Sequence, residues 1–332
     1  MLEIKDKYNI GIVGSTGLIG KTLIKLLEES SIQINNLYLF ASSKSVGKIV
    51  KFKDQNICVR KFGEEFYDLL DIVFFTAPAS ISSKYIPKLI EKDILIIDNS
   101  SYYRLFDGVP LVTPYVNDQN LIKYRLIANP NCSTIQAVSI LKIIDDLFKL
   151  NEINYATYQA VSGSGYKGVL DLERRKKSFY PYNIIKTCIP SIGNAAKNNN
   201  TEEENKMINE TRKILSNKKL KISATCVRVP ILVGHGIVTT VKTKKKISIN
   251  LLKEKLSQNP RIIIKDDLPN NIYPTSIDTY NNDSIYVGRF RLVNNKELVF
   301  YSTSNNLLTG AASNSIYICE KYLNELHKKM PN

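Results

Sequence analysis

Residues 9–20, Asn-Ile-Gly-Ile-Val-Gly-Ser-Thr-Gly-Leu-Ile-Gly, decide the fold of the first part of the chain. Asn9–Val13 is a short apolar strand, and apolar residues recur at helical spacing after the glycines. In such a turn Gly14 permits a sharp reversal, Gly17 lets the backbone approach a pyrophosphate, and Gly20 lets the helix pack close to the sheet. The spacing is G-x-x-G-x-x-G, so a glycine-rich turn without a ligand is the alternative. The strand before it and the helix after it favour nucleotide binding.

Strands and helices alternate through the first 130 residues. A helix is expected from Ser83 to Lys92, between two apolar strands. This alternation predicts a mostly parallel, doubly wound sheet of the Rossmann type, and hence an α/β fold. The further expected strands are residues 37–40, 72–76, 94–98 and 125–128.

The turn Ala41–Gly47 follows the second strand, where a Rossmann fold meets the adenosine ribose. No Asp or Glu ends that strand to bind a ribose 2′-hydroxyl group. Ser42, Lys44 and Ser45 instead offer hydroxyl groups and a cation to a 2′-phosphate, which favours NADP over NAD. A surface turn without a ligand is the alternative.

Asn129-Pro-Asn-Cys-Ser133 joins a short apolar strand to a segment with helical periodicity. The turn places Cys132 at or beside a helix N-terminus, where backbone N–H groups and the helix dipole favour a thiolate. That position activates a nucleophile and offers amides to a developing oxyanion. A buried, unreactive cysteine is the alternative that the spacing leaves open.

Beyond residue 150 the pattern changes to β-rich runs, which predict a second, α+β domain with a mixed or antiparallel sheet. Thr201–Glu204 forms a capping box for the helix that follows. On this helix Glu203 and Lys206 lie three residues apart on one face, and an ordinary surface ion pair is the alternative to a functional role. A final helix is expected at about 310–327.

Composition bounds the class of protein. The 332 residues are 43% hydrophobic and 23% charged, as in an ordinary globular protein, and this length usually forms two domains. The start of the chain carries several charged residues before the first strand, unlike a signal peptide, and no run of about 18 apolar residues predicts a membrane span. Five cysteines without a C-x-x-C pair and only two histidines argue against a zinc site. We therefore expect a reduced, cytoplasmic protein without a metal.

The formal net charge of +15 admits two interpretations. One is a basic surface that binds nucleic acid. The other is a lysine-rich chain of AT-rich codon usage that binds small anionic ligands. The lysines are scattered, the densest cluster being residues 242–246, and no nucleic-acid motif accompanies them. We favour the second interpretation.

Several independent motifs, in one order along nearly the whole chain, resemble those of the aspartate-β-semialdehyde dehydrogenases, of the semialdehyde dehydrogenase family. A set of such motifs is far more specific than any one of them. The motifs are residues 14–20, 98–104, 129–136, 158–165, 226–230, 234–235, 287–291 and 305–311.

The resemblance implies the catalytic roles. Cys132 resembles the nucleophile that forms an acyl-thioester, and Gln159 resembles the side chain that orients the substrate. His235 resembles the general acid/base, because an imidazole that is neutral or protonated near pH 7 suits proton transfer to and from a thiohemiacetal oxygen. A structural histidine in a turn is the alternative. Gly236-Ile237 follows His235 where relatives commonly have Ser-Glu.

The resemblance also implies the binding residues. Arg104 and Lys206 resemble phosphate ligands. Arg228 resembles the bidentate partner of the substrate α-carboxylate, and Glu203 resembles the partner of its ammonium group. The implied cofactor-binding residues are Gly14, Ser15, Thr16, Gly17, Leu18, Ile19, Ser42, Lys44, Ser45, Ala77, Ser162, Gly163 and Asn306.

The implied reaction is the reversible, NADPH-dependent reductive dephosphorylation of β-aspartyl phosphate to aspartate semialdehyde through a Cys132 thioester. It belongs to lysine, threonine, methionine and diaminopimelate biosynthesis. Residues 1–131 and 308–332 would form the NADP-binding domain, and residues 132–307 the catalytic and dimerisation domain. The implied assembly is a homodimer, with a tetramer as the alternative, and its partners are small molecules, with neither nucleic acid nor membrane.

Two other functions stay open. N-acetyl-γ-glutamyl-phosphate reductase shares the implied fold and thioester chemistry but takes a longer, acylated substrate, and the Glu203 and Arg228 pair favours a free amino-acid end. A non-catalytic, basic nucleotide-binding or RNA-binding protein would use the Rossmann half alone.

Overall fold

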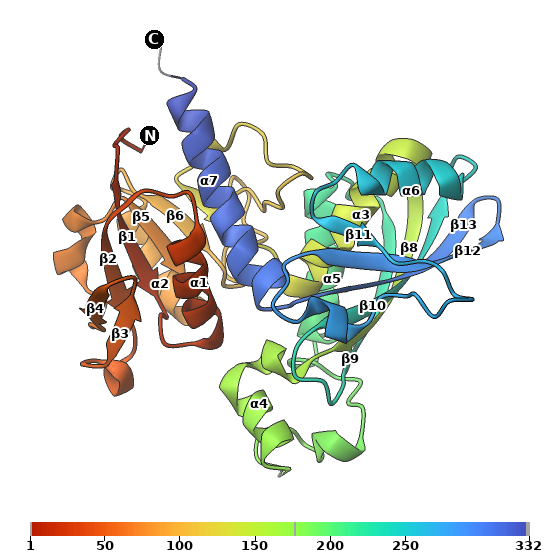
Figure 1. The fold of residues 1–332 in the computed structure, drawn as a ribbon, viewed down its shortest axis with the longest axis horizontal. Helices are drawn as coiled ribbons and strands as arrows, with labels where there is room; N and C mark the ends of the chain where they lie inside the picture. The colour runs from red at the N-terminus through yellow and green to blue at the C-terminus, as the bar shows by residue number, and fades with distance from the viewer. Residues whose placement is uncertain (1, 176, 330–332) are drawn as a thin grey trace. The chain divides into compact units, whose positions relative to one another are not determined.

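The computed structural model describes residues 2–175 and 177–329 (Figure 1). It divides into two compact units. Unit 1 comprises Met1–Pro130 and Ala311–Asn332, and unit 2 comprises Asn131–Gly310.

Unit 1 is built on a parallel sheet with the strand order β2-β1-β5-β6-β7. Two strands of the sheet, β5 and β6, are buried along their whole length, and they are apolar except for Asp98 at the end of β6, as parallel strands covered on both faces require. α1 (Leu18–Glu29) and α7 (Ser313–His327) pack on one face, and α2 (Ala79–Leu89) packs on the other. The predicted doubly wound sheet is confirmed. Its strands are β1 (Tyr8–Val13), β2 (Ile34–Phe40), β5 (Ile72–Phe75), β6 (Leu95–Asp98) and β7 (Leu126–Ala128).

The boundaries of two predicted helices were wrong. The helix expected from Ser83 is α2, which begins at Ala79, because the serines of its first turns obscure the apolar pattern. One of them, Ser82, is fully buried and donates a hydrogen bond to Asp98 Oδ1 at 2.9 Å. The final helix, expected from about Gly310, begins at Ser313 after a turn of π-helix, Leu308–Ala312.

The sequence did not predict the two-stranded hairpin that follows the turn Ala41–Gly47. Its strands are β3 (Ile49–Phe52) and β4 (Gln55–Cys58), which pair antiparallel. They are short and largely exposed, so neither carries a strong alternation of apolar and polar residues.

Unit 2 is built on a mixed sheet with the strand order β11-β12-β13-β10-β8-β9, as predicted for the second domain. The two outer pairs are parallel and the inner pairs are antiparallel. α3 (Cys132–Phe148), α5 (Glu202–Ile214) and α6 (Ile249–Ser257) share one apolar core with the sheet. The strands are β8 (Leu150–Gln159), β9 (Lys221–Arg228), β10 (His235–Thr243), β11 (Ile262–Ile264), β12 (Ile285–Asn294) and β13 (Glu297–Ser304).

A smaller helix, α4 (Gly165–Glu173), follows the end of β8 through a short 3₁₀ turn. It belongs to a separate apolar cluster of unit 2 that includes Val161, Tyr180 and Ile184. Within the described part of the chain, no helix is both long enough and apolar enough to span a bilayer.

Candidate active site

Cys132 is the first residue of α3, and the sequence places it there through its N-cap. Asn131 has extended backbone angles, and its side-chain oxygen accepts hydrogen bonds from the N–H groups of Ser133 at 3.0 Å and Thr134 at 3.4 Å. The predicted position of Cys132 at a helix N-terminus is therefore the one observed. Because the cap occupies the amides of Ser133 and Thr134, these two N–H groups are engaged and do not face an oxyanion formed at this thiol.

Gly310 lies directly against Cys132. A Cβ atom on Gly310 would lie 2.6 Å from Cys132 Cβ and 3.0 Å from its Cα, closer than real Cβ atoms approach. Gly310 belongs to the π-helical turn Leu308–Ala312, a conformation that is frequent at functional sites. The cysteine is thus fixed on this side by backbone that tolerates no added side-chain atom.

Glu203 is the centre of a buried polar cluster beside this cap. Its Oε1 accepts hydrogen bonds from Asn131 Nδ2 at 2.9 Å and from Gln159 Nε2 at 3.2 Å, and its Oε2 lies 3.3 Å from Lys206 Nζ. Burial opposes ionisation of this carboxyl, but Lys206, Asn131 and Arg228 outweigh it and lower its pKa. Glu203 is only 5% exposed, so the alternative of an ordinary surface ion pair does not hold.

A second cluster converges on the backbone of Ala160, the residue after Gln159. Arg228 Nη1 donates to Ala160 O at 2.7 Å, and the Ala160 N–H donates to His235 Nδ1 at 3.0 Å. Arg228 and His235 are almost fully buried. Among the described residues, Arg228 Nε and His235 Nε2 have no hydrogen-bond partner. Both atoms are therefore available to a ligand.

Gly163 fits closely against these two side chains. A Cβ atom there would lie 2.8 Å from Arg228 Nη1 and 3.4 Å from the His235 ring. The structure thus places Gly163, predicted to contact the cofactor, against the predicted carboxylate ligand and the predicted acid/base.

The environment of His235 keeps its imidazole neutral. Burial and the nearby Arg228 lower the pKa of His235 to about 3, with Glu203 acting weakly in the opposite direction. Because Nδ1 accepts a hydrogen bond, the neutral ring carries its proton on Nε2. The sequence suggested an imidazole that titrates near pH 7, and the structure instead holds a neutral hydrogen-bond donor.

The two other predicted cofactor contacts of unit 2 bind each other. Asn306 Nδ2 donates to Ser162 Oγ at 2.9 Å, and Asn306 Oδ1 accepts from the Gly234 N–H at 3.1 Å. Gly234 adopts a φ of 97°, a conformation that favours glycine, and it directly precedes His235. Asn306 therefore joins the turn of Ser162 to the residue that leads into β10.

The structure shows why a glycine follows His235, at a position where relatives commonly have a serine. Gly236 lies on β10 beneath the Tyr301 side chain, because a Cβ atom there would meet Tyr301 Oη at 2.0 Å. A phenol therefore occupies the space of a side chain at this position.

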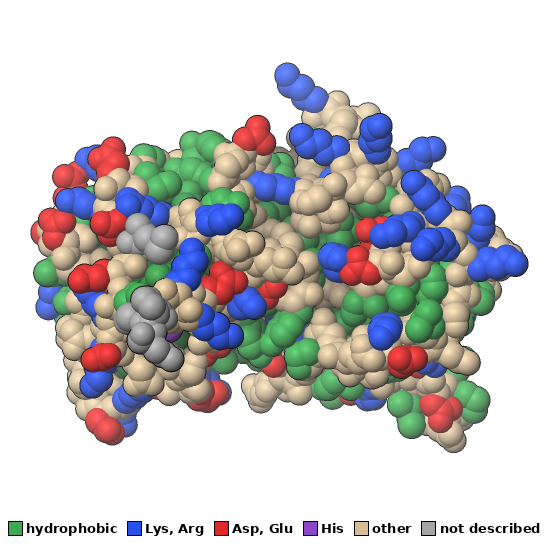
Figure 2. All heavy atoms as spheres, turned by 90° about the horizontal axis from the view of Figure 1, so that it is seen from above, with side chains coloured by type: hydrophobic (Ala, Val, Ile, Leu, Met, Phe, Trp, Pro, Cys, Tyr) green, Lys and Arg blue, Asp and Glu red, His purple; other side chains and the backbone are tan. Residues whose placement is uncertain are grey.

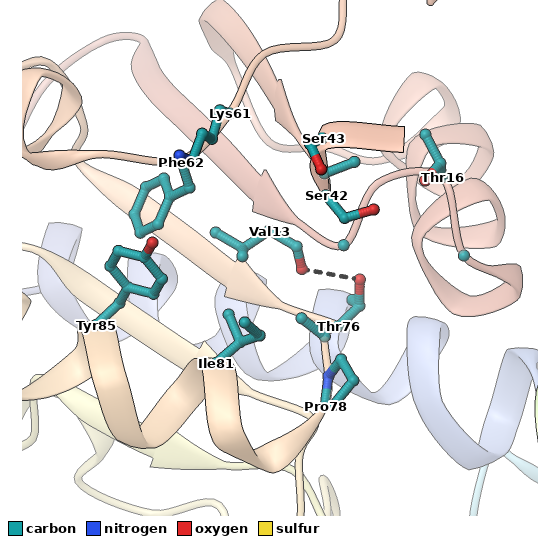
Figure 3. Close-up of a pocket in the computed structure, with 14 residues that line it drawn as sticks. Val13, Thr16, Ser42, Ser43, Lys61, Phe62, Thr76, Pro78, Ile81 and Tyr85 are labelled. Atoms are coloured by element: carbon teal, nitrogen blue, oxygen red, sulfur yellow. Dashed lines mark hydrogen bonds between the residues drawn. The ribbon is translucent and has the colours of Figure 1, made fainter. Parts of the chain in front are cut away.

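Unit 1 holds a cavity of about 400 Å³ next to the glycine turn (Figure 3). Gly14 adopts a φ of 97°, and a Cβ atom there would meet Thr76 and Ala77 at 2.8–2.9 Å. The Thr76 hydroxyl donates to Val13 O at 3.1 Å, which fixes the floor of the cavity. The cavity is lined by Val13, Gly14, Thr16, Gly17, Ala41, Ser42, Ser43, Lys61, Phe62, Thr76, Ala77, Pro78, Ile81 and Tyr85.

Five of the predicted cofactor-binding residues, Gly14, Thr16, Gly17, Ser42 and Ala77, line this cavity. Others lie around it without lining it. Ser15 is fully buried and donates its hydroxyl to Phe40 O, Ser45 accepts a hydrogen bond from Thr16, and Lys44 is exposed. Leu18 and Ile19 are half-buried in the first turn of α1.

Sequence reasoning missed the aromatic end of the cavity. Figure 3 shows Lys61, Phe62 and Tyr85 at one end, and Thr16, Ser42 and Ser43 toward the other. The Phe62 and Tyr85 rings meet edge to face with centroids 5.1 Å apart. These residues come from separate segments, and no local pattern marks them as neighbours.

Arg104 belongs to unit 1, whereas the other predicted substrate ligands belong to unit 2. It is 8% exposed, and its Nη2 donates to Asn99 O at 2.8 Å. The turn that carries it is held by Asp98, which accepts hydrogen bonds from the Ser100 N–H and hydroxyl. Its predicted role beside Lys206 stays a prediction.

Comparisons with known proteins identify the family. Residues 9–124 match the model "Semialdehyde dehydrogenase, NAD binding domain", and residues 141–309 match "Semialdehyde dehydrogenase, dimerisation domain". The chain is 38% identical to the aspartate-semialdehyde dehydrogenase of Campylobacter jejuni, over 98% of this chain and 100% of that protein. The chain belongs to the aspartate-semialdehyde dehydrogenase family. The enzyme of Aquifex aeolicus is 37% identical over 96% of this chain and 98% of its own length.

Solved structures of the aspartate-semialdehyde dehydrogenase family share this fold. Aspartate semialdehyde dehydrogenase II of Vibrio cholerae, complexed with ASA, superposes with a TM-score of 0.93 at 31% identity, over 97% of this chain and 99% of that one. The resemblance, the enzyme class of oxidoreductase and the dinucleotide-binding domain are thus confirmed. The two other functions are not favoured.

The basic charge of this aspartate-semialdehyde dehydrogenase family member is spread unevenly. In Figure 2, one part of the face carries Lys and Arg side chains with few Asp or Glu side chains among them, and another part carries both kinds side by side. In the densest sequence cluster, Lys242 pairs with Glu152 at 3.3 Å, and the three lysines at 244–246 are exposed. These lysines lie outside the clusters around Glu203 and Ala160.

Proposed function

We propose that this chain catalyses the reversible, NADPH-dependent reductive dephosphorylation of β-aspartyl phosphate to aspartate semialdehyde. The observation that carries the proposal is the arrangement in unit 2. Cys132 begins α3, and the side chain of its N-cap, Asn131, donates to Glu203. Glu203 also accepts a hydrogen bond from Gln159, and the residue after Gln159, Ala160, binds Arg228 and His235 through its backbone. The nucleophile thus directly follows a residue of the buried network that also holds a carboxylate-binding cation and a hydrogen-bond donor.

Cys132 supplies the nucleophile. Its thiolate attacks the acyl carbon of β-aspartyl phosphate, the carbon–sulfur bond forms, and phosphate leaves with the electron pair of the carbon–oxygen bond. NADPH, when bound, supplies the hydride that reduces the resulting thioester. The oxyanion of the resulting thiohemiacetal re-forms the carbonyl group of aspartate semialdehyde, while the carbon–sulfur bond breaks and its electron pair leaves with the Cys132 thiolate.

His235 acts on the oxygen at the reacting carbon. Its Nε2–H is buried and unpartnered among the described residues, so it can donate a hydrogen bond to the oxyanion that develops there. The cap of α3 occupies the amides of Ser133 and Thr134, which makes this donor more important. Gln159, fixed by Glu203 and Thr157, orients the substrate beside it.

Charged groups bind the two ends of the substrate. Arg228 receives the α-carboxylate on the edge that includes its unpartnered Nε, and Glu203 receives the ammonium group. Lys206 and Arg104 bind the phosphate. Lys206 is one-third exposed and paired with Glu203, so it can reach an incoming anion.

Unit 1 fits a dinucleotide. Gly14 and Gly17 line the cavity, and in the described part of the chain no side chain caps the start of α1. The first-turn amides can therefore face a pyrophosphate. Ser42, Lys44 and Ser45 are proposed to select the 2′-phosphate of NADP. Ser162, Gly163 and Asn306 are proposed to face the nicotinamide.

We further propose a cytoplasmic homodimer formed through unit 2, since its residues 141–309 match the family's dimerisation domain. Pairing of two dimers into a tetramer is the second candidate assembly. The partners are small molecules and include no nucleic acid or membrane. The reaction would serve lysine, threonine, methionine and diaminopimelate biosynthesis, with unit 1 as the cofactor domain and unit 2 as the catalytic one.

The test is NADP reduction with aspartate semialdehyde, with and without phosphate. Phosphate-dependent reduction is expected, and Cys132→Ser should remove most of it while keeping NADP binding. Cys226→Ser is the matched control, because that thiol is buried and burial raises its pKa to about 12. Activity only with N-acetylglutamate semialdehyde, or a fully active Cys132→Ser variant, would contradict the proposal.

A further inference from the structure

We propose that Glu210 is a positioning residue that fixes the backbone from which Cys132 projects. The inference rests on the proposed role of Cys132 as the nucleophile. Glu210 lies on α5, seven residues and about two turns after Glu203, so both carboxylates lie on one face of the helix. It is 1% exposed.

The two carboxylates hold the same residue at different points. Glu210 Oε2 accepts a hydrogen bond from the Asn131 backbone N–H at 2.6 Å, and Glu203 Oε1 accepts one from Asn131 Nδ2 at 2.9 Å. Asn131 in turn caps α3 and directly precedes Cys132. Its backbone and its side chain are therefore both tied to α5, and its freedom to rotate or shift is small.

The Asn131 N–H needs this partner. As an N-cap in extended conformation, Asn131 directs its N–H outside the hydrogen-bond ladder of α3, and the residue is only 7% exposed. Pro130 before it has no N–H to offer. A buried N–H without an acceptor is costly, and a carboxylate is the strongest acceptor that a side chain supplies. Loss of this contact lets the residue before the nucleophile move.

No charge of the substrate is assigned to Glu210. Its hydrogen bond to Asn131 goes to a backbone amide, whereas the substrate charges are assigned to Arg228, Lys206, Arg104 and Glu203. We therefore expect Glu210 to act by fixing the position of Cys132, and to influence kcat more than KM.

Two substitutions distinguish the contribution of the length of the Glu210 side chain from that of its charge. Glu210→Gln keeps the length and one acceptor oxygen but removes the charge. Glu210→Asp keeps the charge but withdraws the acceptor by one methylene group. Thr211→Val is the control for a local loss of packing, because Thr211 is the adjacent, fully buried residue and its hydroxyl lies 3.2 Å from the Tyr155 hydroxyl, away from Asn131.

We expect the three variants to differ in kcat in a fixed order. Glu210→Asp should lower kcat by about 10²-fold, the scale of a misplaced reacting group, with KM for aspartate semialdehyde and phosphate within about threefold of wild type. Glu210→Gln should stay within about fivefold of wild type, and Thr211→Val should lower the melting temperature without changing kcat. Alkylation of Cys132 by iodoacetamide should be slowed in Glu210→Asp and normal in Glu210→Gln.

Any other order overturns the inference, including equal losses in the two Glu210 variants or a larger loss in Glu210→Gln. The alkylation rate is read without turnover. If the wild-type enzyme lacked the proposed activity, the proposed function would fail, while the alkylation rates would still test the positioning of Cys132.

Discussion

Protonation of His235 should destabilise the native protein. The pKa of His235 is about 3 in the native structure, against 6.5 for an ordinary histidine. Between these values the unfolded chain binds one more proton than the native chain does, so the free energy of unfolding falls as the pH falls below 6.5. The slope is about 1.4 kcal/mol per pH unit once the unfolded histidine is charged.

The size of the effect follows from the same two pKa values. From pH 7.5 to pH 5, His235 should remove about 2 kcal/mol from the free energy of unfolding. Above pH 5 the native His235 stays neutral for any pKa well below 5, so the pH dependence of the unfolding free energy is the same whatever the exact value. Carboxyl groups with lowered pKa values, such as Glu203, lose their stabilising contribution only at lower pH, below the ordinary value of 4.5.

The assay compares urea denaturation of the wild type and of His235→Gln at several pH values between 7.5 and 5. The difference between their unfolding free energies should change by about 2 kcal/mol over this range, with the wild type losing more. The chain has two histidines, so the imidazole NMR signal that the substitution removes is that of His235. That signal should stay constant from pH 8 to pH 5. A titration midpoint above pH 5, or equal pH slopes in the two proteins, would refute the reasoning.

Three substitutions test the binding assignments. Gly163→Ala should displace Arg228 by about half an ångström, raising KM for aspartate semialdehyde by about tenfold and leaving NADP affinity within about threefold. A selective loss of NADP affinity would instead show that the added methyl group displaces the nicotinamide and not Arg228. Arg228→Lys keeps the charge but loses the paired hydrogen bonds, so KM for aspartate semialdehyde should rise while KM for phosphate stays constant. Equal changes in both KM values would indicate a general distortion of the site. Lys44→Glu should weaken NADPH more than NADH. Lys61→Glu is the control for Lys44→Glu. If Lys61→Glu weakened NADPH more than NADH, the 2′-phosphate would bind near Phe62 and not near Lys44.

Local signals made the fold predictable. The glycine turn, the apolar strands and the capping box of Thr201 and Glu204 each arise from residues close in sequence, and all appear in the structure. The start of α2 was missed because Ser82 faces inward, where Asp98 satisfies its hydroxyl. A polar residue buried by a distant partner disrupts the periodicity on which such predictions depend.

The residues of the site were more predictable than their physical state. Cys132, Gln159, His235 and Arg228 were singled out by motif. The structure connects the last three in one buried network of unit 2, and Cys132 directly follows Asn131, which also belongs to it. Their burial could not be read from spacing, because it depends on how β8, β9, β10 and α5 pack together. For the same reason the low pKa of His235 had no signal in the sequence.

The closeness of Arg228 to His235 links substrate binding to proton transfer. The Arg228 charge is the second cause of the low pKa of His235, after burial. A substrate carboxylate on Arg228 offsets that charge at the imidazole, so binding weakens one of the two effects that oppose protonation. The free enzyme therefore holds His235 as a neutral donor, and a substrate carboxylate bound to Arg228 would raise the pKa of the imidazole. Gly163 keeps the two side chains close enough for this coupling.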